Sequence, residues 1–176
     1  MNDRFVGEGY FVSHCNFSEE VLKELQSMPK RVYVHNVTLR DGEQQAGVAF
    51  RKDEKVEIAR AFDEAGVDRI EAGMPAVSPE DMEAVKEIAK LGLSAKVFAF
   101  ARCLRSDVDL ALKCDMEGVV MEIPSSDHLL RRAYKWDEDK AIQLVVGATS
   151  YAHDHGLYVA FFHNRFDPCD SKPRGV

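Results

Sequence analysis

The chain has 176 residues, of which 45% are apolar and 30% charged, and its formal net charge is −7. This composition is that of an ordinary soluble globular domain with a sizeable core, and its negative charge argues against nucleic acid or an anionic membrane surface as a partner. No apolar run approaches the ~20 residues that span a bilayer, so we expect no membrane segment. The N-terminus does not resemble a signal peptide and the four cysteines form no C-x-x-C pair, so we expect a reducing, cytoplasmic compartment.

Five short apolar runs alternate with helical patterns along the chain. Their apolar members are mostly β-branched or aromatic, and Gly or polar residues bound each run, as is typical of buried parallel strands. The runs are Arg31–Val37, Val67–Ala72, Ala95–Ala101, Gly118–Ile123 and Leu157–Phe162.

The segments between these runs carry helix start and stop signals. Capping residues, a Pro at a first helical position and terminal glycines indicate where most of these helices begin and end. The expected helices run from Asp53 to Gly66, from Ser78-Pro79 to Gly92, from about Asp107 to Lys113, and from Asp137 to Gly156; Glu19–Gln26 suggests one more before the first strand.

Strand and helix repeated five times predict an α/β fold with a parallel sheet and right-handed crossovers. A complete (β/α)8 barrel takes ~250 residues, so the pattern fits either the first part of a TIM barrel or a complete open sheet of the flavodoxin type. We expect an N-terminal extension with one helix over residues 1–30, about five βα units forming a catalytic domain over residues 31–165, and a flexible tail over residues 166–176.

The run Leu39-Arg40-Asp41-Gly42-Glu43-Gln44 follows the first expected strand, and ten residues separate Gln44 from Lys55. An Arg and an acid at a strand end are costly unless they have a ligand or a partner. The carboxylate suits Mg²⁺ or Mn²⁺, or part of a Zn²⁺ site, and the guanidinium can stabilise a developing oxyanion. A structural Arg–Asp pair beside a turn Gly accounts for the same residues.

Three later strand ends carry further candidates. Glu71 ends the second strand, where its carboxylate either orients Arg40 or a substrate group, or pairs with a nearby cation. Arg102 ends the third strand and either faces a substrate carboxylate or begins a helix at the surface. Ser125 follows the fourth strand and either contacts substrate or, like Ser126, caps a helix.

The pattern LRDG-x-Q followed by Lys55 resembles the N-terminal signature of the 2-isopropylmalate, homocitrate and citramalate synthases. The run Ile70-Glu71-Ala72-Gly73, followed by Pro75, resembles the second strand of the same metal-dependent TIM-barrel family, which condenses acetyl-CoA with 2-oxo acids. The resemblance therefore favours a partial TIM barrel over an open sheet.

The same resemblance implies roles for individual residues. It implies that Asp41 is a metal ligand, that Arg40 polarises a carbonyl and that Glu71 assists catalysis. It places Gln44 next to the bound 2-oxo acid, and Glu43 holds the turn. Arg102 and Ser125 are then substrate-binding candidates.

The chain also departs from the family pattern at its far end. Asn164 stands where the family commonly has a Glu, and Ala160 stands where lysine-pathway homocitrate synthases carry an Arg, which argues against 2-oxoglutarate as substrate. The family's metal-binding His-x-His pair is missing: His153 and His155 have the spacing but lie at the end of an expected helix, where they do not share a face. His163 is the remaining histidine candidate.

The resemblance implies an acyltransferase of amino-acid biosynthesis that condenses acetyl-CoA with a 2-oxo acid and uses a divalent metal ion (Mg, Mn or Zn). We expect the chain to be a truncated, N-terminal part of such an enzyme, with its own activity left open. The alternatives are a lyase of the 3-hydroxy-3-methylglutaryl-CoA (HMG-CoA) type and a non-catalytic partial barrel that binds a small carboxylate or a partner chain. Because five strands leave sheet edges and apolar helix faces uncovered, we expect a homo-oligomer or a complementing chain.

Overall fold

The computed structural model describes residues 30–124, 126 and 128–164, Glu19, Lys23 and a small hairpin near the N-terminus, with residues 163 and 164 described by their backbone alone. The chain divides into two compact units, Met1–Val32 and Tyr33–Val176. In the first unit, β1 (Val6–Gly7) pairs antiparallel with β2 (Tyr10–Phe11), a hairpin that the sequence did not predict. The expected helix over Glu19–Gln26 falls on a stretch of which only two residues are described, and the expected tail over residues 166–176 lies outside the described residues.

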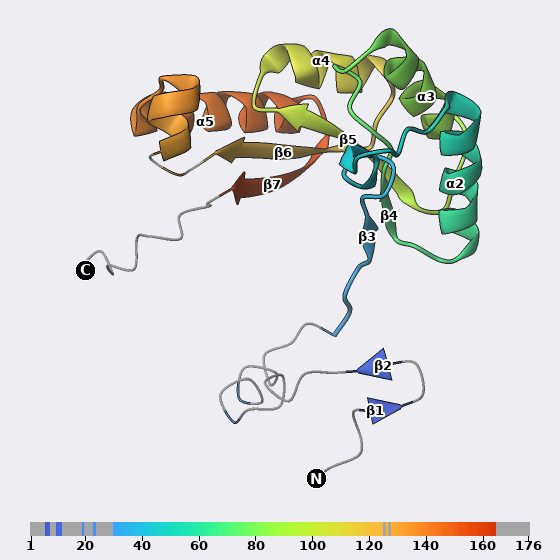
Figure 1. The fold of residues 1–176 in the computed structure, drawn as a ribbon. Helices are drawn as coiled ribbons and strands as arrows, with labels where there is room; N and C mark the ends of the chain where they lie inside the picture. Colours follow the sequence, from blue (N-terminus) through green and yellow to red (C-terminus); the bar gives the residue numbers. More distant parts are fainter. Residues whose placement is uncertain are drawn as a thin grey trace. The chain divides into compact units, whose positions relative to one another are not determined.

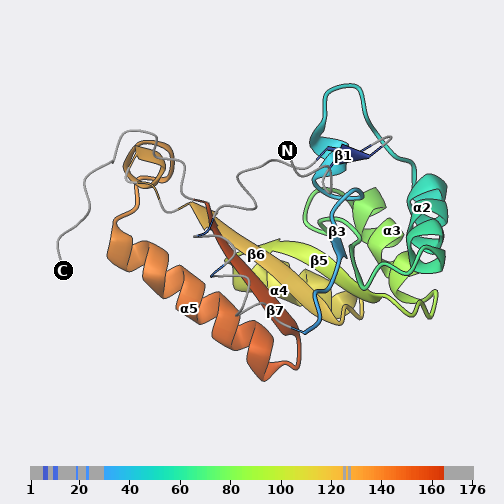
Figure 2. The same cartoon turned by 90° about the horizontal axis from the view of Figure 1, so that it is seen from below.

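Within the described residues, the second unit contains five parallel strands in chain order and four α-helices, which lie along one side of a curved sheet (Figure 1; Figure 2). The strands are β3 (His35–Asn36), β4 (Arg69–Glu71), β5 (Lys96–Arg102), β6 (Gly118–Pro124) and β7 (Tyr158–Asn164), and the helices are α2 (Lys52–Glu64), α3 (Pro79–Ala89), α4 (Arg105–Lys113) and α5 (Glu138–Asp154). A flavodoxin-type sheet has the order 2-1-3-4-5, so the observed order identifies a half-barrel.

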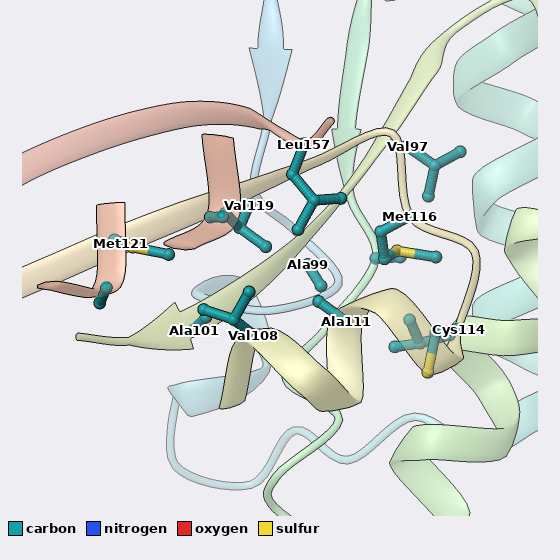
Figure 3. Close-up of a cluster of buried hydrophobic side chains, with 14 of the residues drawn as sticks. Val97, Ala99, Ala101, Val108, Ala111, Cys114, Met116, Val119, Met121 and Leu157 are labelled. Atoms are coloured by element: carbon teal, nitrogen blue, oxygen red, sulfur yellow. The ribbon is translucent and has the colours of Figure 1, made fainter. Parts of the chain in front are cut away.

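The core between the sheet and the helices follows from the alternation of side chains along the strands. Val97, Ala99 and Ala101 of β5 point toward the helical layer, where they belong to one buried cluster with Val108 and Ala111 of α4 (Figure 3). Successive side chains of a strand point to opposite faces, so the neighbouring Phe98 and Phe100 lie on the inner face of the half-barrel. They form a second buried cluster there with Val120, and Met74 and Ala160 pack against it.

The helix starts confirm two predicted caps and correct a third. The side chain of Ser78 accepts the backbone N–H of Asp81 before α3, and Asp137 accepts that of Lys140 before α5. The first crossover helix does not begin after an Asp53 cap. It begins at Lys52, because the carboxylate of Glu54 reaches back to the backbone N–H of Arg51 at 2.8 Å.

The first strand is shorter and more exposed than the apolar run predicted. Only His35 and Asn36 pair with β4, whereas Tyr33 and Val34 are 52% and 57% exposed. The reason is position: this run lies at the edge of the sheet, so it has a neighbouring strand on one side only. No helix within the described part of the chain has the length and apolar character needed to cross a membrane.

Candidate functional site

Polar side chains gather at the edge where the parallel strands end. The turn after β3 winds around one acceptor, because the carbonyl of Val37 receives the backbone N–H groups of Arg40, Asp41 and Gly42 at 3.1, 2.8 and 3.2 Å. This wrapping brings a cation and a carboxylate, next to each other in sequence, to the carboxyl end of the sheet. In (β/α) barrels that end carries the active site.

The guanidinium of Arg40 is held from three sides. Its central carbon lies 3.6 Å above the ring centroid of Phe100, within the range of a cation–π contact. Its Nη1 donates to Oδ1 of Asp41 at 3.1 Å, and its Nε lies 3.5 Å from Oε1 of Glu71. The sequence did not single out Phe100, although strand alternation places it on the same inner face as Phe98.

Glu71 is a buried carboxylate at the end of β4, with its side chain 4% exposed. One oxygen lies 3.5 Å from Arg40, and the other lies 3.5 Å from Nε2 of His35. Both distances are longer than a good hydrogen bond, and Nε2 of His35, Nε of Arg40 and Oε1 of Glu71 are buried without a hydrogen-bond partner. Such unsatisfied groups are rare in native proteins, which sets these three side chains apart from the rest of the interior.

His35 is the residue of this group that the sequence analysis missed. It pairs with Arg69 in the register of β3 and β4, and its ring meets Phe98 edge-on with the centroids 5.3 Å apart. The sequence did hold a signal for His35. It lies in the first expected strand, two residues before Val37, and because side chains alternate along a strand, residues two apart lie on the same face of the sheet.

Asp41 is the metal-ligand candidate, and its side chain is 59% exposed. Among the described residues, no group of three His, Cys, Asp or Glu side chains is placed to hold a metal ion. One carboxylate does not hold a divalent ion firmly, so Asp41 stays a candidate ligand, and the described residues do not form a complete metal site around it.

Lys55 lies between the turn and the helices. Its side chain is 3% exposed, and Nζ donates to Oε2 of Glu43 and to Oδ1 of Asp81, both at 2.7 Å. Burial by itself lowers the pKa of Lys55, but the hydrogen bonds that Lys55 donates to Asp81 and Glu43 outweigh burial and raise it. Burial likewise acts to raise the pKa of Asp81, and the hydrogen bonds from Lys55 and Ser78 bring it below its usual value.

A pocket of about 280 Å³ opens beside this ion-pair cluster. It lies at the amino ends of α2 and α3, which bring Arg51, Lys52 and Glu80 to its wall together with Phe50. Cationic and anionic side chains are mixed along the wall, so its charge selects no class of ligand.

Of the remaining candidates, the structure describes Gln44 and Arg102. Gln44 is exposed at the end of a short 3₁₀ turn over Gly42–Gln44. Arg102 makes two hydrogen bonds to the buried carboxylate of Asp107, from Nε at 2.8 Å and from Nη2 at 3.0 Å. Ser125 lies outside the described residues, whereas Ser126 is buried and accepts the backbone N–H of Leu129 at 3.3 Å, which is a capping role.

Among the described residues, five parallel strands and four α-helices form a half-barrel with Arg40, Asp41 and Glu71 at the carboxyl ends of its strands. This arrangement defines the class: a (β/α)-barrel protein with a candidate site at the usual face. The HMGL-like family matches residues 31–172, and the chain belongs to this family.

Curated relatives of the chain carry synthase names. A homocitrate synthase (AksA) of Methanopyrus kandleri is 43% identical over 145 residues, which are 82% of this chain and 36% of that protein. A probable 2-isopropylmalate synthase of Ignicoccus hospitalis is 41% identical, over 80% of this chain and 35% of the relative. The (R)-citramalate synthase CimA of Methanocaldococcus jannaschii is also 41% identical, over 73% of this chain and 26% of that protein. The chain thus spans about a third of the length of the first two of these relatives.

Solved structures confirm the barrel fold. HMG-CoA lyase of Brucella melitensis superposes with a TM-score of 0.67 at 16% identity, covering 81% of this chain and 52% of the lyase. Hydroxymethylglutaryl-CoA lyase of Pseudomonas aeruginosa superposes with a TM-score of 0.64 at 21% identity, covering 77% of this chain and 47% of the lyase. At these identities the likeness concerns the fold alone. The expected partial TIM barrel is confirmed.

Proposed function

We propose that this chain carries the Arg40–Asp41–Glu71 part of the active site of an acyl-CoA:2-oxo acid condensing enzyme. The observation that supports it most directly is the pose of Arg40, fixed on Phe100 and beside Glu71 at the carboxyl end of the sheet. The relatives that are 41–43% identical carry the names of three synthases, which is the second support.

In the proposed reaction, acetyl-CoA loses a methyl proton, and the resulting carbon attacks the keto carbon of a 2-oxo acid. Hydrolysis of the thioester then releases CoA and a 2-hydroxy dicarboxylic acid. As the bond forms, negative charge develops on the former keto oxygen. Among the described residues, we assign the stabilisation of that charge to the guanidinium of Arg40, because its contacts with Phe100 and Glu71 fix its position before the reaction.

The other residues take supporting roles in this proposal. Glu71 orients Arg40 and keeps its charge balanced, and Gln44 contacts the bound 2-oxo acid from the exposed turn. Arg102 and Ser125 remain candidates for substrate binding; Arg102 would have to leave Asp107 to fulfil that role. Asp41 contributes one carboxylate to a divalent metal ion whose other ligands are not among the described residues, so no step here depends on that ion.

The test is incubation of the full chain with acetyl-CoA, Mg²⁺ or Mn²⁺ and a panel of 2-oxo acids, with free thiol measured over time. Release that requires the oxo acid supports a condensing activity, and product analysis then identifies the acid used. No release above the Arg40→Ala variant, with any acid or metal, would refute catalysis by this chain.

A second candidate function is binding without turnover. The absence of a three-ligand metal group among the described residues favours it. In that case calorimetry detects binding of a 2-oxo acid that Arg40→Ala abolishes, while thiol release stays at background. A lyase of the HMG-CoA type was the other enzyme expected from the sequence, but the likeness to solved lyases, at 21% identity or below, concerns the fold alone and does not favour that activity.

A further inference from the structure

The buried ammonium group of Lys55 connects two parts of the molecule that are far apart in sequence. Glu43 belongs to the turn after β3, and Asp81 belongs to the first turn of α3. One nitrogen donates to both carboxylates at 2.7 Å from a position 3% exposed. A single cation between two anions has little room to move, because each carboxylate fixes it against the other.

Both ends of this connection are anchored. The second oxygen of Glu43 accepts the backbone N–H of Phe50 at 2.9 Å, so both carboxylate oxygens of Glu43 accept hydrogen bonds, one from Phe50 and one from Lys55. The second oxygen of Asp81 accepts the hydroxyl of Ser78 at 2.6 Å, at the capped start of α3. The turn is thus attached through Lys55 to the helical layer of the half-barrel.

The turn held in this way contains the residues of the candidate site. Glu43 lies two residues after Asp41 and three after Arg40, directly after the residues 40–42, whose backbone N–H groups bond to the carbonyl of Val37. The backbone hydrogen bonds of the turn run within the turn itself, whereas the bonds of Glu43 reach outside it. Leu39, directly before Arg40, anchors the start of the turn in the core, and the contacts of Arg40 and Glu43 hold the part that follows it.

We infer that Lys55 is a positioning residue, whose ammonium group acts through Glu43 to hold the Arg40–Asp41 turn in the pose that places the Arg40 guanidinium over Phe100. Lys55 touches neither a substrate nor a reacting atom in this assignment. The importance of the pose for catalysis depends on the proposed function, but the pose itself is measurable without turnover.

The pose of Arg40 can be measured by NMR through its Nε–H resonance. Its guanidinium lies above the ring of Phe100, so the ring current moves its Nε–H proton resonance upfield of that of an exposed arginine. In a ¹⁵N-labelled full chain, this resonance is assigned by its loss in Arg40→Lys. Hydrogen exchange of the backbone amides of residues 40–44 reports the order of the turn in the same samples.

Two matched variants separate positioning from simple stabilisation. Glu43→Ala and Asp81→Ala each remove one carboxylate from Lys55, but only the first removes contacts made by the turn itself. We expect Glu43→Ala to move the Arg40 resonance toward that of an exposed arginine and to speed exchange at residues 40–44 by about tenfold or more. Asp81→Ala should lower the thermal midpoint while leaving the Arg40 resonance and the exchange of the turn near their native values.

Lys55→Met should reproduce the effect of Glu43→Ala on the Arg40 resonance. If that variant fails to fold, Glu43→Gln decides the question, because it keeps an oxygen for the backbone N–H of Phe50 but removes the negative charge that faces Lys55. An Arg40 resonance unchanged by Glu43→Ala, or moved equally by Asp81→Ala, would overturn the assignment. Lack of thiol release by the wild-type chain would refute the proposed function and leave this test of Lys55 unaffected.

Discussion

Arg40 shows how several weak restraints combine at the scale of single residues. An aromatic face, an adjacent carboxylate and a buried carboxylate each restrict the guanidinium from a different direction. Arg also offers a planar group that stacks on Phe100, which the ammonium group of Lys does not. Charge alone therefore does not account for the residue type at this position.

This difference leads to a prediction for Arg40→Lys. If the proposed condensation occurs, the variant should lose about 10²- to 10³-fold in kcat, because a misplaced cation no longer stabilises the oxyanion. Thiol release under saturating 2-oxo acid measures the effect. Arg60→Lys, a change at an exposed helical position, serves as the control, and equal rates for both variants would contradict the role of Arg40.

The buried thiols provide a second prediction at this scale. Burial raises the pKa of Cys103 to about 11 and also raises the pKa of Cys114. Because the thiolate is the reactive form, neither residue should be alkylated by iodoacetamide at neutral pH in the folded chain. Mass spectrometry of the peptides containing each cysteine checks this, with a guanidinium-unfolded sample as the positive control; rapid labelling in the folded state would be evidence against the packed core.

At the scale of elements, β6 lies so close to its neighbouring strands that there is no room for a side chain at Gly118. A Cβ added at Gly118, at the start of β6, would lie 2.4 Å from the ring of Phe98 and 2.6 Å from the carbonyl oxygen of Tyr158. The inner-face packing of Phe98 thus requires a glycine on the neighbouring strand. Gly147 differs, because a Cβ there, within α5, meets nothing within 4 Å.

We therefore expect Gly118→Ala to destabilise the fold by about 1–3 kcal/mol or more, since backbone or ring must shift to make room. Gly147→Ala should instead stabilise it by about 0.5–1 kcal/mol through its helix propensity. Urea unfolding of the two variants beside the wild type measures both effects. A Gly118→Ala protein as stable as the wild type would show that the two strands do not approach this closely.

The link between α2 and α3 gives a dependence on pH. The pKa of Asp81 is lowered from its ordinary 3.8, so its stabilising effect is present above that pH and lost as the pH falls through the lowered value. The pKa of Lys55 is raised from 10.5, so its contribution is present below that pH and lost only at more alkaline pH. Between these limits the ion-pair cluster should contribute a constant amount.

The corresponding measurement compares wild type with Asp81→Ala by urea unfolding across the pH range. The difference in unfolding free energy should be level between about pH 5 and pH 10 and should shrink as the pH falls below about 4. A difference that grows on acidification would have the wrong sign for a carboxylate paired with Lys55.

At the scale of the whole second unit, apolar side chains remain exposed beside the last strand and on the last helix. Tyr158, Phe161 and Phe162 of β7 are 40–59% exposed, and Ile142 and Val146 of α5 are 56–59% exposed. Exposed apolar groups next to a sheet edge favour association. Oligomerisation, expected from the sequence, stays a prediction.

We expect the chain to self-associate in a concentration-dependent way. Phe162→Glu should weaken this association, because it places a charge among the exposed apolar groups of β7. Val77→Glu, at a position 66% exposed before α3, should leave it unchanged. Light scattering after size-exclusion chromatography measures the mass; a wild-type chain that is monomeric at all concentrations would contradict the expectation.

The sequence by itself determined those features whose signals are local. Cap residues such as Ser78 and Asp137 bond to backbone a few residues away, and short apolar runs located most of the strands, so helices and strands appeared close to their expected places. Arg40, Asp41 and Glu71 were recognisable because each follows or ends a strand run, and parallel strands end at one edge.

Only the tertiary structure decided which distant side chains meet. Four observations depend on how strands and helices far apart in sequence are brought together. They are the contacts of Arg40 with Phe100, of His35 with Glu71 and of Lys55 with Asp81, and the exposure of the first strand's apolar run. Periodicity records which face a residue lies on, but it carries no information about the partner on another element. That partner is set by the order and register of the strands, which only folding of the whole sheet establishes.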